Sequence, residues 1–160
     1  MADLEDILRD NMILNRDGID DVGSNAAPVT ITDAAGFVEY VNPGGGYEDG
    51  NISLWNKTTN TLDCSQLPAY NKIELILRST INVTDINAIV TVKFVIPDPG
   101  GEIIVDELDI VPAKKNVDYI ERAVFNGYAG ASAVTHGIKA YTKVSSGSVT
   151  VSNRTLLVRV

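Results

Sequence analysis

Hydrophobic and polar residues alternate with a period of two along most of the chain from Val29 onward. The clearest segments are residues 70–80, "YNKIELILRST", and residues 87–97, "NAIVTVKFVIP", which are long and rich in β-branched residues. In the second segment one face would carry Ala88, Val90, Val92, Phe94 and Ile96. Such alternation is typical of strands in which one face is buried.

Further segments with this pattern follow at regular intervals. Strands are predicted at residues 29–32, 37–41, 102–111, 133–144 and 149–160, with weaker patterns at 52–56, 61–67 and 117–125. The turn "PDPGG" predicts a β-hairpin between residues 87–97 and 102–111. Residues 117–125 could instead form a short helix. No connection is long and periodic enough for a crossover helix, so we expect an all-β, antiparallel, jelly-roll-like sandwich.

Helical spacing occurs only near the N-terminus, where Leu4, Ile7, Leu8 and Met12 would share one face of a helix over residues 3–12. A helix this short needs a covering surface, so we expect these four residues to contact a neighbouring subunit. Residues 15–28 predict a loop by composition. The expected organisation is an arm and loop over residues 1–27 and one sandwich domain over residues 28–160.

The acids of this arm suggest how it could dock. Asp3, Glu5, Asp6 and Asp10 could face basic residues of a neighbour, for which the sequence offers Lys139, Lys143, Arg154 and Arg159. Such contacts would orient the arm more than they would stabilise it.

Residues 41–51, "VNPGGGYEDGN", form the most glycine-rich stretch. A phosphate-binding loop needs a following helix and a lysine or serine on the anion, whereas this stretch has no lysine and precedes another predicted strand. We expect an exposed, flexible connection at an edge of the sandwich. The acids of residues 16–21 and 46–51 lack the alternating spacing of a calcium loop, so no metal site is expected.

Candidate catalytic residues are few, because the chain has one histidine, His136, and one cysteine, Cys64. We expect His136 to be a structural residue on an apolar strand face and Cys64 to serve packing or lie idle. The four acids of one predicted strand, which alternate with apolar residues and indicate a solvated face, are Glu102, Asp106, Glu107 and Asp109. The sequence therefore predicts no enzyme, no catalytic site and no cofactor.

Charge and hydropathy narrow the partners. A net charge of -8 and a pI near 4.5 disfavour nucleic-acid binding, and the sequence shows neither a membrane-spanning run nor an export signal. The charge is uneven, since residues 1–21 hold seven acids and two bases, whereas residues 122–160 hold five bases and no acid. We interpret this bias first as a solvated surface.

A single acidic, cysteine-poor β-domain, with an amphipathic segment "MADLEDILRDNM" in front and Gly/Asn/Thr-rich turns, resembles the capsid decoration, or cement, proteins of tailed bacteriophages. The resemblance implies a structural protein, often trimeric, that binds the major capsid protein and stabilises the shell. It would be made in the host cytoplasm and end on the capsid surface. The alternatives are a tail-fibre or carbohydrate-binding module that recognises a host glycan and, after it, an enzyme.

Overall fold

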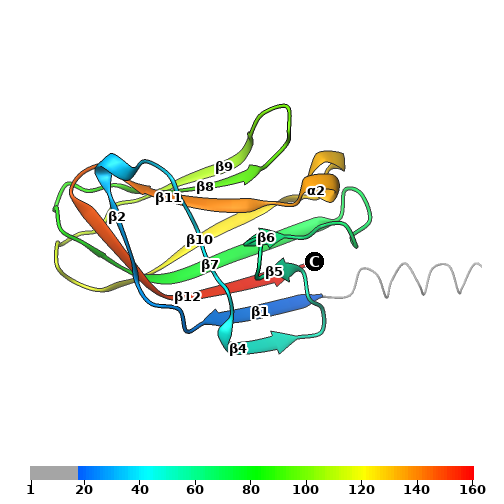
Figure 1. Ribbon diagram of the computed structural model, residues 1–160, viewed down its shortest axis with the longest axis horizontal. Coiled ribbons are helices and arrows are strands. Elements are labelled where there is room, and N and C mark those ends of the chain that lie inside the picture. Colours follow the sequence, from blue (N-terminus) through cyan, green and yellow to red (C-terminus); the bar gives the residue numbers. More distant parts are fainter. Residues whose placement is uncertain (1–17) are drawn as a thin grey trace, which may run out of the picture.

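The structure is a computed structural model that describes residues 18–160, which form two antiparallel sheets packed face to face (Figure 1). The elements in chain order are β1 (Ile19–Ser24), β2 (Val29–Thr32), η1 (Asp33–Ala35), β3 (Val38–Glu39), β4 (Gly45–Gly50), β5 (Trp55–Asn56), β6 (Thr61–Leu62), β7 (Lys72–Val83), β8 (Val90–Ile96), β9 (Ile103–Ile110), β10 (Tyr119–Tyr128), α2 (Ala131–His136), β11 (Lys139–Val144) and β12 (Ser148–Arg159).

The larger sheet, called sheet A, has the strand order β10-β7-β12-β1-β4, and β2 also pairs with β12. The long strand β12 pairs with β2 through its first half and with β1 through its second half. A β-bulge separates the halves, at Asn153 with φ 47°. Sheet B has the order β3-β11-β8-β9, and the short β5 and β6 pair with each other. Every strand pair is antiparallel, so the predicted antiparallel sandwich is confirmed.

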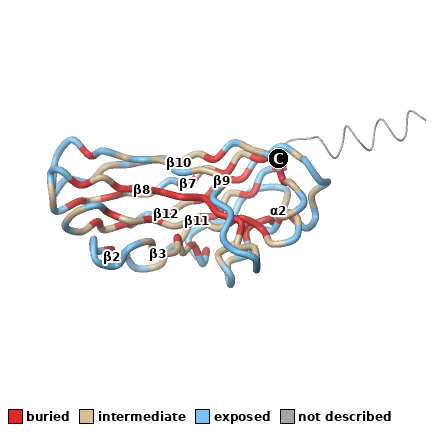
Figure 2. The backbone as a smooth tube through the Cα atoms, turned by 90° about the horizontal axis from the view of Figure 1, so that it is seen from above, coloured by how far each residue is buried: buried red, intermediate tan, exposed pale blue. Residues whose placement is uncertain are grey.

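The core lies between the sheets. Side chains from alternate positions of β7, β10 and β12 meet those of β8 and β11, and Phe94 contacts Phe125 with ring centroids 5.6 Å apart. All seven residues of β8 are buried, and this strand is red along its length in Figure 2. The apolar face predicted for β8 is therefore in the core, and the opposite face is also shielded from solvent.

The two strongest sequence patterns are confirmed as β7 and β8, the strand predicted over residues 149–160 is confirmed as β12, and the hairpin predicted at "PDPGG" joins β8 to β9. Residues 119–128 form strand β10 rather than the short helix that was the alternative. The weak segments 52–56 and 61–67 are reduced to the two-residue strands β5 and β6.

The loop predicted over residues 15–28 is wrong for Ile19–Ser24, which form β1 between β12 and β4. Composition misled here, because Asp20 is an unusual strand residue whose buried carboxylate accepts two backbone N–H bonds. Val22 lies in the core. Sheet A thus already includes residues that the sequence assigned to the arm.

The strand predicted over residues 133–144 is wrong in its first half, where Ala131–His136 form helix α2. Two glycines flank the helix, and Gly137 adopts φ 73°, a left-handed conformation that ends a helix at low cost. The alanines between them favour helix over strand. The strand begins at Lys139, and from there the predicted alternation of faces holds.

The glycine-rich stretch is not a flexible connection, since Gly45–Gly50 form β4, the edge strand of sheet A. Its six residues are exposed, and its backbone pairs with β1. The expected location at a sandwich edge is correct. The predicted helix over residues 3–12, with Leu4, Ile7, Leu8 and Met12, lies outside the described residues.

Candidate functional site

The exposed large apolar side chains fall mainly into two groups. The first group follows β9 and the connection after it, and comprises Ile103, Ile104, Val111 and Val117. The second lies on the face of sheet A turned away from sheet B, and comprises Ile19, Tyr47, Ile120 and Tyr128. Contiguous exposed apolar surface is a common mark of an interaction site, whereas isolated residues are not.

The first group, called the β9 edge, lies on β9, the outermost strand of sheet B, and on the connection that follows it. Ile104 is 57% exposed and Val111 is 70% exposed. The acids predicted to form a solvated face lie on the same strand, and Asp109 accepts a hydrogen bond from Thr91 at 2.7 Å. Glu102, just before the strand, accepts from the Lys93 ammonium at 2.8 Å. The β9 edge therefore combines apolar and acidic groups.

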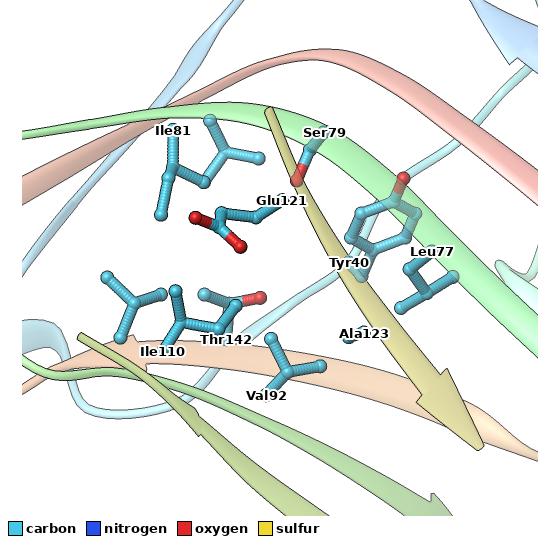
Figure 3. A pocket seen from close by; sticks show the side chains of 11 residues that line it. Tyr40, Leu77, Ser79, Ile81, Val92, Ile110, Glu121, Ala123 and Thr142 are labelled. Carbon is cyan, nitrogen blue, oxygen red and sulfur yellow. The ribbon is translucent and has the colours of Figure 1, made fainter. Parts of the chain in front are cut away.

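A cavity of about 20 Å³ lies between the sheets beside β9 and β10. Figure 3 shows the Glu121 carboxylate beside Ile81 and Ile110, with Ser79 and Thr142 among the lining residues. This volume is close to what one water molecule needs and far below the roughly 300 Å³ of the smallest typical ligand pockets. The cavity is a packing feature that keeps one acid near the sheet interior.

His136 lies in the last turn of α2 rather than on a strand face. Its Nε2 is 3.7 Å from Asp98 Oδ2, at the rim of an open depression of about 390 Å³ that Asp63 and Lys139 also line. The side chain is half-buried. The cluster brings together a cation and two carboxylates, but it contains no hydroxyl or thiol nucleophile hydrogen-bonded to the imidazole within the described residues.

Cys64 is fully buried in the core, which confirms the packing interpretation. Burial raises the pKa of its thiol to about 12, and the neighbouring Asp63 adds to the shift. A thiol in this environment stays protonated at neutral pH and is a poor nucleophile.

The acids that the sequence analysis considered as calcium ligands do not form one cluster. Oδ2 of Asp20 accepts hydrogen bonds from the Leu54 and Trp55 amides at 2.7 Å each, which ties β1 to the start of β5. Asp21 and Asp49 lie opposite each other on β1 and β4. Among residues 18–160 no group of three or more His, Cys, Asp or Glu side chains is placed to hold a metal ion.

The four cations suggested as partners of the acidic arm all have partners within residues 18–160. Lys139 pairs with Glu39, Arg159 pairs with Glu74, and the Lys143 ammonium lies 4.5 Å from the Phe37 ring centroid.

Arg154 is the fourth of these cations, and it is buried. Its Nη2 donates a hydrogen bond to the Ala27 carbonyl at 2.8 Å. Desolvation lowers the pKa of this guanidinium. Docking of the arm stays a prediction, and these four residues are already engaged.

Sequence reasoning did not single out two other cations, Arg78 and Arg122, which form no ion pair within residues 18–160. Both are exposed and lie directly opposite each other on β7 and β10. The only sequence signal was their position in the alternation, which places each on the face opposite the core residues of its strand.

No helix among the described residues is long and apolar enough to cross a membrane.

Comparison with known proteins supports the fold. No protein-family model matches the chain, and no curated protein matches its sequence. The solved structure of Eiger TNF from S. frugiperda is similar, with a TM-score of 0.51 at 6% identity, over 89% of this chain and 91% of that one. The naturally occurring empty particle of cowpea mosaic virus matches with a TM-score of 0.29 at 10% identity, over 89% and 79% of the two chains. That second value is too low to support an argument. The first similarity shows that the chain has a jelly-roll-like β-sandwich fold.

Proposed function

We propose that the protein is a non-enzymatic structural protein of a virion, which binds the outside of a phage capsid shell and stabilises it as a decoration protein. The observation that carries the proposal is the β9 edge, where apolar side chains line β9 and the connection after it, and where the outer backbone edge of β9 pairs with no other strand of residues 18–160. Ile103 is 42% exposed and Val117 is 41% exposed, in addition to the more exposed Ile104 and Val111. Removing such side chains from water would favour association with a second protein.

The chemistry of the β9 edge also limits what it binds. A free strand edge can accept an extended segment of a partner through backbone hydrogen bonds. The exposed Glu107 and Asp109 on the same strand disfavour pairing of two identical edges, because their carboxylates would repel each other. The edge is therefore better suited to a different protein, such as the major capsid protein, than to a second copy.

A decoration protein gains affinity by presenting several copies of a modest interface to a repeating shell. The resemblance implies a trimer, and we propose that the protein acts as a symmetric oligomer at junctions between capsid subunits. Each additional contact then adds to the residence time on the shell without enlarging the single interface.

The test mixes the purified protein with phage shells assembled without a decoration protein and images the particles by electron cryomicroscopy. Regular additional density on the shell surface is expected. The variant Ile104→Asp should lose this density, because it places a charge in the proposed contact. Thr58→Asp is the control, since Thr58 is an exposed residue in the turn between β5 and β6.

Two results would contradict the proposal. Equal decoration by Ile104→Asp and by the unchanged protein would refute the β9 edge as the contact. Absence of shell binding, together with saturable binding to host cells or glycans, would support the tail-fibre or carbohydrate-binding alternative instead.

A further inference from the structure

The outer face of sheet A, which is the face turned away from sheet B, carries an unusual arrangement of charge. Strand register places its side chains in rows that cross the sheet. One row comprises Arg122, Arg78, Thr155, Gly23 and Tyr47. The next row comprises Val124, Ile76, Leu157, Asp21 and Asp49. In these two rows the cations lie on the β10 flank and the acids on the β4 flank, whereas Glu74 and Arg159 of the following row form an ion pair with each other.

The basic pair, Arg78 and Arg122, consists of like charges directly opposite each other on neighbouring strands. Such a pair is unfavourable in an isolated sheet. No carboxylate within residues 18–160 forms an ion pair with either guanidinium. Both side chains are exposed, so they are available to a group outside the sandwich.

The acidic pair, Asp21 and Asp49, repeats this arrangement with the opposite sign on β1 and β4. Asp21 accepts a hydrogen bond from the Tyr47 hydroxyl at 3.0 Å, and neither carboxylate forms an ion pair with a cation of the described residues. Tyr47 crosses the face above Gly23, where a Cβ atom would lie 2.3 Å from the ring. The Tyr47 ring therefore covers Gly23 of β1, next to Thr155 of β12.

We propose that the outer face of sheet A is a docking surface for a second copy of this chain, related by a two-fold axis. An axis in the plane of the contact, passing over β12 between Thr155 and Leu157, exchanges the β10 flank with the β4 flank. The basic pair of each copy then meets the acidic pair of the other, twice by symmetry. Two unfavourable like-charge pairs in the monomer become two sets of opposite charges in the dimer.

The centre of this face is apolar, as expected for a contact with a second copy of the chain. Leu157, Ile76 and Val124 form an apolar row across β12, β7 and β10, and all three are half-buried in the monomer. Two shallow depressions of about 270 and 220 Å³ flank this row.

The available area can be compared with that of known interfaces. Five strands at about 4.8 Å spacing, over about 30 Å of strand length, give on the order of 700 Å², close to the roughly 800 Å² per partner of a stable interface. Strand pairing in the contact is not required, because the two sheets meet through their side chains.

This contact is independent of the proposed function, because it does not use the β9 edge and needs no shell. It is also compatible with a trimer formed through another surface, in which case the face joins copies of two trimers. The purified protein alone is therefore the appropriate sample.

The test reverses the two charge pairs separately. One variant carries Arg78→Glu and Arg122→Glu, and the other carries Asp21→Lys and Asp49→Lys. Each has like charges on both flanks, so sedimentation equilibrium at low salt should show self-association weakened at least about tenfold. An equimolar mixture should restore association as a one-to-one pair of the two variants. Added salt should weaken every one of these contacts.

The control variant carries Lys114→Glu and Lys115→Glu, which makes the same change of net charge as the arginine variant, but in the exposed connection after β9. It should associate as the unchanged protein does. Circular dichroism and thermal melts establish that each variant is folded.

The proposal is overturned if the unchanged protein stays monomeric at about 100 µM, a concentration at which even a weak specific contact forms. It is also overturned if mixing the two reversed variants restores nothing, or if the reversed and control variants associate alike. Loss of association on deleting residues 1–12, without an effect of the charge reversals, would assign the contact to the arm instead.

Discussion

Asp20→Ala should destabilise the sandwich more than any other single loss of a carboxylate among the described residues. The Asp20 side chain is buried, with 5% of its surface exposed, and its Oδ2 accepts the Leu54 and Trp55 amides at 2.7 Å each. Hydrogen bonds to a charged acceptor contribute about 1.5–3 kcal/mol each, and the substitution leaves two buried donors without a partner. The free energy of unfolding should fall by about 3–5 kcal/mol.

Trp55 provides the assay, because it is the only tryptophan and lies at the affected site. It is 3% exposed, and its Nε1 donates to the Asn42 carbonyl at 2.8 Å. Urea unfolding followed by tryptophan fluorescence should show a midpoint lower by about 2 M for a slope of about 2 kcal/mol/M. Asp20→Asn keeps an oxygen acceptor without the charge and should lose only about 1–2 kcal/mol.

The matched control is Asp33→Ala, since Asp33 is exposed and its carboxylate accepts, within residues 18–160, only the adjacent Ala34 amide. Its midpoint should change by less than about 0.3 M. All samples are compared at one protein concentration, because association stabilises the folded chain. A midpoint for Asp20→Ala within the range of this control, at an unchanged slope, would refute the assignment of Asp20 as the buried anchor of β1.

Two further outcomes follow from buried contacts. Burial raises the pKa of Cys64 from 9.0 to about 12. At pH 9 iodoacetamide should therefore label the native thiol far more slowly than the thiol of the urea-unfolded chain, and stability should be lost as the pH rises from about 9 to about 12, where the unfolded state releases the proton and the folded state keeps it. A Cys64→Ala variant with the same alkaline loss would contradict this. Gly23→Ala should cost about 1–3 kcal/mol in thermal melts, because its Cβ would lie 2.3 Å from the Tyr47 ring, and Tyr47→Ala should remove most of that cost. An equal cost in both backgrounds would exclude the ring as the cause.

Alternation was sufficient to predict the long strands that lie in the middle of each sheet. In β7 and β12 most inward positions are apolar and buried, so the sequence pattern and the burial pattern largely coincide; the exceptions are Ser79 in β7 and the buried Arg154 after the bulge in β12. The same reasoning failed where the backbone, rather than the side chains, forms the element. β4 is composed largely of glycine and acids, and it is a strand because its backbone pairs with β1.

Local sequence also could not reveal partners that are distant in the chain. Asp20 favours a loop by its residue type, and only the amides of Leu54 and Trp55 make it acceptable in a buried strand. Helix α2 shows the converse case, because its apolar alternation resembled a strand while Gly130 and Gly137 confined it to one short helix. In both places tertiary contacts and backbone conformation outweighed composition.

The acidic first segment and the basic last segment of the chain were interpreted first as a solvated surface. In the fold, some of these charged residues lie on the outer face of sheet A. Asp21 belongs to the acidic first segment and Arg122 to the basic last segment, and both end on the outer face of sheet A, on opposite sides of β12. Their neighbours Asp49 and Arg78 come from the middle of the chain, residues 22–121, which holds fourteen acids and six bases. Only strand register places each of them opposite a residue of its own sign. The separation of charge on this face is therefore a property of the topology, and reversing one flank tests it without altering the core.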